Sequence, residues 1–299
     1  MALIEIFLKY IRYELNLSTH TVLSYKNDLK QFCEFLKVDD CDLDVATLDA
    51  NDIRAWMVDL TKNGDTARTI RRKIQAIRAF LKFCLKRGYV DANVASDIEL
   101  AKVKKKLPSF IRKDWMDAFL DTEIDEADFI EVRDRLIVEM FYETGIRRAE
   151  LMTLKDEWVD YSRMELKVHG KRDKDRIIPF GALLADKMMH YQKLRNEKVG
   201  RYCEFFFVRS TGKELYPTLI YKIVHNQLLA AGGAGKLSPH VLRHTFASAM
   251  LNDGAEINSV KEILGHSSLS ATQVYTHITI SELKQNYQQA HPRAIKKGG

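Results

Sequence analysis

The chain has 299 residues, of which 46% are hydrophobic and 29% charged, and this composition predicts one large or two ordinary globular domains with packed cores. The net charge of +6 is moderately basic and leaves a solvated surface and nucleic-acid binding equally open. No apolar run approaches the roughly 20 residues that span a bilayer, and the N-terminus lacks a basic start followed by an apolar segment. We therefore expect neither a membrane anchor nor a secretory signal.

The number and spacing of the cysteines indicate the cellular compartment in which the protein works. The chain has four cysteines, which are widely spaced and form no CxxC pair: Cys33, Cys41, Cys84 and Cys203. This spacing argues against a disulfide framework or a zinc ribbon and favours a reducing environment, so we expect a cytoplasmic protein.

The first hundred residues are predicted to be helical. Ser18 can cap a helix that begins near Thr19 and carries apolar residues at helical spacing. A second helix is expected over about 51–64. A third is expected over about 66–87, where isoleucines and leucines recur at three- and four-residue steps until Gly88 ends the pattern.

Basic residues gather on the third predicted helix, largely off its apolar stripe: Arg68, Arg71, Arg72, Lys73 and Arg78. A basic face beside a core stripe can lie against phosphates, because several cations together release the counterions of nucleic acid. A solvated basic face explains this helix equally well, so both interpretations stay open.

A lysine-rich segment over 101–107 precedes Pro108, and such a pattern is typical of an exposed linker. Its lysines Lys104, Lys105 and Lys106 either contact a DNA backbone or merely keep a hinge soluble. We therefore predict a helical domain over 1–100, a linker over 101–107 and a second domain over 108–299.

The second domain is predicted to mix helices with a few strands. A helix is expected over 128–143, and strands over 164–168 and 176–180 flank a polar turn and form a candidate β-hairpin. A further strand is expected over 205–208, and helical structure from Ser238 to the end. The predicted fold class is therefore mainly α with a small β-sheet.

His240 and Arg243 stand at the start of a helix that the pair Ser238-Pro239 predicts. Their three-residue spacing puts both side chains on one face, near N–H groups that favour an anion. Arginine adds a planar fork that matches two phosphate oxygens, and histidine exchanges a proton near neutral pH. In isolation, however, the two residues are better explained as surface or capping residues.

Arg147 follows a predicted helix break at Gly145 and would lie in the first turn of the next helix. A buried arginine needs an orienting carboxylate, and Glu150 is the candidate one turn on. Arg148 competes for the same role, and a solvated surface cation is the default interpretation of each arginine.

Lys171 lies on the predicted hairpin turn, directly after Gly170. A lysine on such a turn can reach into a site and donate a proton to a leaving oxygen. Arg172 and Lys174 compete with it, and a solvated cation is the alternative for all three.

Tyr275 is a candidate nucleophile. A phenol has a pKa of about 10 and is mostly neutral at pH 7, so it needs nearby cations and a proton acceptor to react. A lone tyrosine at helical spacing is otherwise a core aromatic.

Four histidines raise the alternative of a zinc site: His240, His244, His266 and His277. The first two are four residues apart, but the stretch lacks the glutamate of HExxH. Arg243 stands between them and would repel a metal ion. We therefore expect no metal site.

Taken together, six residues resemble in order and spacing the catalytic set of the tyrosine recombinases, the phage-integrase family: Arg147, Lys171, His240, Arg243, His266 and Tyr275. The resemblance covers nearly the whole chain, and its length is most similar to the Xer type of bacteria. It implies a helical, SAM-like core-binding domain followed by a mixed α/β catalytic domain, which together form a C-shaped clamp on DNA. The sequence departs from the family pattern at Arg148-Ala149, where an apolar residue and a serine are frequent.

The resemblance also implies a mechanism. Tyr275 attacks the scissile phosphate and forms a 3′-phosphotyrosyl link, while Arg147 and Arg243 stabilise the charge on the phosphate. Lys171 protonates the leaving 5′-oxygen, His240 exchanges protons, and His266 hydrogen-bonds the phosphate, with Glu150 in support. Neither ATP nor a metal is needed, so no cofactor is expected.

The partner implied by the resemblance is double-stranded DNA with a specific recombination site. Expected DNA contacts are Thr19, His20, Arg68, Arg71, Arg72, Lys73, Lys104, Lys105 and Lys106. In the family four protomers assemble on two sites, in some cases with a second related recombinase and a cell-division DNA translocase, and resolve chromosome dimers. A short apolar stripe near the C-terminus could dock on a neighbouring protomer or pack on its own domain: Ile280, Leu283, Tyr287 and Ala290. A mobile-element integrase, a relaxing topoisomerase and a non-catalytic architectural DNA-binding protein are the alternatives.

Overall fold

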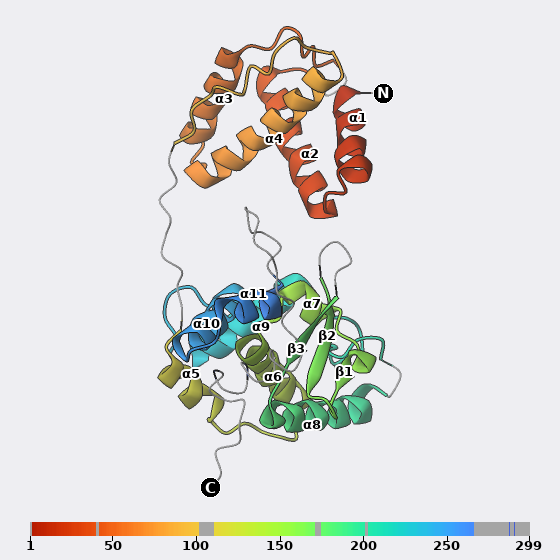
Figure 1. Ribbon diagram of the computed structural model, residues 1–299, viewed down its shortest axis with the longest axis vertical. Coiled ribbons are helices and arrows are strands. Elements are labelled where there is room, and N and C mark those ends of the chain that lie inside the picture. Colours follow the sequence, from red (N-terminus) through yellow and green to blue (C-terminus); the bar gives the residue numbers. More distant parts are fainter. Residues whose placement is uncertain are drawn as a thin grey trace. The chain divides into compact units, whose positions relative to one another are not determined.

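The computed structural model describes residues 2–39, 42–101, 111–170, 175–200 and 203–265, together with Tyr287 and Ala290. The chain divides into two compact units, Met1–Lys106 and Leu107–Gly299, each with its own hydrophobic core (Figure 1). Helices predominate and the sheet is small, which confirms the mainly α fold class.

All the regular secondary structure among the described residues of the first unit is helical. Its elements are α1 (Leu3–Lys9), the π-helical turn η1 (Tyr10–Glu14), α2 (Thr19–Leu36), α3 (Ala50–Lys62) and α4 (Ala67–Lys86). The Ser18 side chain accepts a hydrogen bond from the Thr21 amide and so caps α2, as the sequence predicts. The apolar stripe of α4 is buried in the core, with Ile74 and Ile77 fully inaccessible.

The second unit packs helices around a three-stranded sheet. Its elements are α5 (Lys113–Leu120), α6 (Phe129–Thr144), α7 (Arg148–Met152), the 3-10 turn η2 (Asp156–Trp158), β1 (Val159–Asp160), β2 (Glu165–His169), β3 (Asp175–Pro179), α8 (Ala182–Val199), α9 (Pro217–Ala230), α10 (Pro239–Asn252) and α11 (Ile257–Leu264). The strands are antiparallel in the order β1-β2-β3, and Val168 pairs with Arg176 where β2 and β3 form the predicted hairpin.

Helix α6 is the centre of the second unit. It packs against α8, α9 and α10, and most of its residues are buried, because helices cover it on several sides (Figure 1). Tyr287 and Ala290 are buried in the same core, as the interpretation of packing on its own domain predicts. Ile280 and Leu283 lie outside the described residues.

One predicted strand is absent. Within the described residues the segment 205–208 forms only an isolated bridge between Val208 and Glu214. Phe206 and Phe207 are fully buried, and the Phe206 amide donates to the Leu154 carbonyl over 2.7 Å. The apolar run reflects burial of aromatic rings in the core rather than pairing in a sheet, and periodicity alone does not separate these two cases.

No helix among the described residues is both long enough and apolar enough to cross a membrane.

Candidate functional site

The turn between α6 and α7 determines where Arg147 lies. Gly145 ends α6 in the left-handed region at φ 58°, where a Cβ atom would lie 2.5 Å from Phe246, so the turn requires glycine. Arg147 is the N-cap residue of α7 and Glu150 lies three residues later. The sequence therefore placed both residues at the correct helix start.

Glu150 orients Arg147 through two hydrogen bonds. One carboxylate oxygen accepts the Arg147 amide at 2.8 Å and the other accepts Arg147 Nη1 at 2.7 Å. Arg147 Nη2 donates to the Gly265 carbonyl. The arginine is thus held from two elements, while 29% of its side chain stays exposed to solvent.

Arg243 reaches the same place from α10. Ser238 caps this helix and Pro239 occupies its first turn, as predicted. The buried Arg243 guanidinium donates to the carbonyls of Gly145 and Leu264. It therefore joins the end of α6 to the end of α11.

A third arginine, Arg176 at the start of β3, completes the cluster. Its Nη1 and Nη2 atoms donate to the two carboxylate oxygens of Glu150 at 2.6 and 2.8 Å. Its Nε atom donates to the Ile263 carbonyl at 2.6 Å. No sequence signal indicated this role, since Arg176 only begins a predicted strand and belongs to no motif.

The three arginines converge on the C-terminal end of α11. The carbonyls of Ile263, Leu264 and Gly265 accept from Arg176, Arg243 and Arg147, respectively. The last carbonyls of a helix have no partner within it and carry the negative end of its dipole, so cations are favoured there. Gly265, at φ 61°, ends the helix, and a Cβ atom added to it would lie 3.0 Å from Arg176 Cδ and 3.2 Å from Arg147 Nη1.

The cluster carries more positive than negative charge, because it contains three guanidinium groups and one carboxylate, which accepts from two of them. Burial, and then the charges of Arg147 and Arg176, lower the pKa of Arg243 to about 9. Burial opposes ionisation of Glu150, but Arg176 and Arg147 outweigh it and hold the pKa of Glu150 below its ordinary value. Three positive charges against one negative charge leave the cluster with an excess of positive charge, which a bound anion would offset.

His240 lies on the exposed side of α10, one turn before Arg243. Burial, and then the charges of Arg148 and neighbouring groups, lower the pKa of His240, so its neutral form is favoured at pH 7. A neutral imidazole can accept a proton. Arg148 is exposed, whereas Arg147 is held by Glu150, so the structure separates these two competing arginines.

Three expected site residues lie outside the described residues: Lys171, His266 and Tyr275. Lys104, Lys105 and Lys106 lie outside them too. Within the described part of the chain, no group of three or more His, Cys, Asp or Glu side chains could hold a metal ion.

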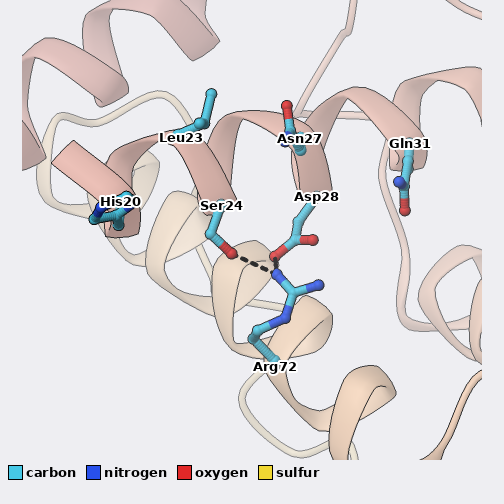
Figure 2. A pocket seen from close by; sticks show the side chains of 7 residues that line it. All are labelled: His20, Leu23, Ser24, Asn27, Asp28, Gln31 and Arg72. Atoms are coloured by element: carbon cyan, nitrogen blue, oxygen red, sulfur yellow. Dashed lines mark hydrogen bonds and ion pairs between the residues drawn. The ribbon is translucent and has the colours of Figure 1, made fainter. Parts of the chain in front are cut away.

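In the first unit, the expected DNA contacts gather at α2 and α4. Figure 2 shows Arg72 of α4 reaching toward α2, where it donates to Ser24 at 2.5 Å and to the buried Asp28. His20 lines the same hollow (Figure 2). Asp28 offsets the charge of Arg72, but nearly half of the Arg72 side chain remains exposed.

The other expected contacts on these helices differ in accessibility. Thr19, Arg68 and Arg71 are exposed. Lys73 is instead buried and pairs with Asp65 at 2.7 Å, so its charge is already neutralised within the fold. The expectation that Lys73 belongs to the basic face does not fit this position, because the helix turns it toward Trp56 and Asp65.

Sequence comparison matches each of the two units to a known domain family. The sequence profile of the phage integrase family matches residues 109–282, and that of the phage integrase N-terminal SAM-like domain matches residues 4–88. The chain belongs to the phage integrase family. A relative within the family, tyrosine recombinase XerC of Oceanobacillus iheyensis, is 35% identical over 295 residues, which cover 97% of this chain and 96% of the relative. The protein is thus an enzyme of the tyrosine recombinase type.

Solved structures of the family share the fold. The Tn1549 transposon integrase in complex with transposon right end DNA matches with a TM-score of 0.70 and 17% identity, over 96% of this chain and 99% of that chain. The XerH site-specific recombinase bound to a palindromic difH substrate matches with a TM-score of 0.69 and 20% identity, over 97% and 81% of the two chains. At these identities the likeness concerns the fold alone.

Proposed function

We propose that the protein cuts and rejoins double-stranded DNA at a specific recombination site through a 3′-phosphotyrosyl intermediate on Tyr275. One observation carries this proposal: three arginines converge on the end of α11 beside one carboxylate, Glu150 of α7, which accepts from only two of them, so the site favours an anion. A scissile phosphodiester supplies that charge, and its non-bridging oxygens match the planar fork of arginine.

We propose a role for each site residue, and the arrangement described above supports those of Arg147, Arg243 and Glu150. Arg147 and Arg243 stabilise the additional negative charge that develops when the phosphate is attacked, and Glu150 keeps Arg147 oriented. His240 exchanges protons with the reacting groups, which its lowered pKa supports. Lys171 protonates the leaving 5′-oxygen and His266 hydrogen-bonds the phosphate.

The chemistry conserves the energy of the phosphodiester bond. The Tyr275 oxygen bonds to phosphorus as the 5′-oxygen leaves, and a 5′-hydroxyl of the partner strand later reverses the step. Every bond that breaks is replaced by one of the same kind, so we propose that neither ATP nor a metal takes part.

The first unit contributes affinity for the DNA backbone. Five residues of α2 and α4 are proposed to face DNA: Thr19, His20, Arg68, Arg71 and Arg72. Lys104, Lys105 and Lys106 are proposed to contact phosphates from the linker. The exposure of Arg72 supports this role, because nearly half of its side chain is accessible while the ion pair with Asp28 offsets its charge.

We propose that four protomers act on two sites, with a second related recombinase and a cell-division translocase as partners, and that the protein resolves chromosome dimers in the cytoplasm. The full-length similarity to XerC supports the chromosomal role. An assay with two recombination sites distinguishes this recombinase from a topoisomerase, which relaxes DNA without exchanging strands.

The test is covalent trapping on a nicked duplex that carries the sequence which the protein selects from a randomised DNA library. We expect the wild-type protein to form an adduct that survives denaturation, and Tyr275→Phe to bind the same duplex without forming it. Tyr287→Phe is the matched control, since Tyr287 is buried in the core, and we expect it to trap DNA. An adduct with Tyr275→Phe would refute the assignment of the nucleophile.

A further inference from the structure

Arg176 is a buried cation for which the proposed chemistry has no role. Only 10% of its side chain is exposed, whereas 29% of the Arg147 side chain is. Its Nε, Nη1 and Nη2 atoms all donate inward, to Ile263 and to Glu150. These contacts join Arg176 to both oxygens of the carboxylate that also accepts from Arg147.

We propose that Arg176 is a positioning residue, which sets the direction of Arg147 by fixing the Glu150 carboxylate and the last turn of α11. The proposal rests on the function proposed above. Arg176 contacts no substrate in this scheme and acts only through Glu150 and through the backbone at 263–265.

Arg176 can influence the position of Arg147 through two sets of contacts. The first runs through Glu150, since each carboxylate oxygen accepts one bond from Arg176 and one from Arg147. The second runs through α11, because Arg176 holds the Ile263 carbonyl two residues before the Gly265 carbonyl that accepts from Arg147. Without Arg176 the Glu150 carboxylate can rotate and the end of α11 can shift. Both movements change the direction of the Arg147 guanidinium.

Stability alone does not explain a third arginine at this place. The charge of Arg176 is one of the causes that lower the pKa of Arg243, so the two cations repel each other. Replacement of buried ion pairs by apolar residues is often neutral or stabilising. The unfavourable charge fits a site that is built for orientation, where a displacement of about 1 Å can cost a hundredfold in rate.

The experiment compares wild type, Arg176→Met and Arg176→Lys on the nicked duplex selected from the randomised library. We expect site affinity to stay within about twofold, while the single-turnover rate of adduct formation falls about 10- to 100-fold in Arg176→Met. Arg176→Lys keeps the charge but not the two-pronged contact, so its rate should lie between the two. Arg163→Met is the matched control, since Arg163 precedes β2 and most of its side chain is exposed, and we expect the wild-type rate.

A double-mutant cycle distinguishes positioning from a general structural effect. If Arg176 acts through Arg147, then Arg176→Met should slow an Arg147→Lys protein by less than about threefold. Independent effects that multiply would overturn the proposal, and so would loss of folding in both Arg176 variants, because the role would then be structural.

The two proposals fail in different ways. If the wild-type protein forms no adduct with any selected duplex, the proposed function fails and the role of Arg176 fails with it. If the wild type forms the adduct and Arg176→Met forms it equally fast, only the role of Arg176 is refuted.

Discussion

At the scale of the residue, Glu150 is the only acidic side chain that the described contacts place among the three arginines, and it accepts from two of them. Removal of one partner from a buried ion pair costs about 3–5 kcal/mol, because the remaining charge stays buried without compensation. Glu150→Gln keeps the shape of the side chain but leaves the arginines without a negative charge. We expect a loss of about 3 kcal/mol of unfolding free energy at pH 7.

The pKa of Glu150 sets the pH dependence of that loss. Since this pKa is lower in the folded state than its ordinary value of about 4.3, the ionised carboxylate stabilises the protein above that value. The contribution disappears as the pH falls from about 4.3 through the folded pKa. Urea unfolding at pH 7 and pH 3.5 should therefore show a smaller difference between wild type and Glu150→Gln at the lower pH. The exposed Glu157→Gln is the control, and a difference that does not change with pH would contradict the argument.

At the scale of the element, local signals predicted much of the structure. Cap residues and apolar periodicity located α2, α4 and α10, because a helix satisfies its backbone locally. The resemblance to the tyrosine recombinases, rather than these local signals, grouped Arg147 with Arg243, while the spacing of one helical turn indicated Glu150 as the partner of Arg147. Arg176 could not be predicted in this way, since its partners Glu150 and Ile263 lie 26 and 87 residues away along the chain.

Gly265 tests the role of the end of α11. An added Cβ atom would lie 3.0 Å from Arg176 Cδ and 3.2 Å from Arg147 Nη1, so Gly265→Ala should displace both side chains. Gly254→Ala is the matched control: its φ of 92° imposes backbone strain as well, yet a Cβ atom there would have no neighbour within 4 Å. We expect Gly265→Ala to slow adduct formation at least tenfold more than Gly254→Ala. Equal rates would show that the helix end does not position the arginines.

At the scale of the whole molecule, the described core residues form two separate clusters, one in each unit. Because each unit buries its own apolar residues, we expect fragments 1–106 and 107–299 to unfold cooperatively when expressed separately. Each fragment should bind the selected duplex with a weaker dependence on salt than the intact chain, since fewer phosphates are contacted. Thermal unfolding and binding at several salt concentrations check both points, and a salt slope in one fragment equal to that of the whole chain would contradict the second.

The contacts of the arginines with the end of α11 also limit how far Tyr275 can lie from that helix end. Gly265 is fixed by its contact with Arg147, and Tyr275 follows ten residues later in the sequence. A fully extended chain spans at most about 3.6 Å per residue, so the Cα atom of Tyr275 can lie no farther than about 36 Å from Gly265. Insertions after Gly265 lengthen this reach and deletions shorten it. The number of residues after the helix end thus limits which phosphates of a bound DNA the proposed nucleophile could reach.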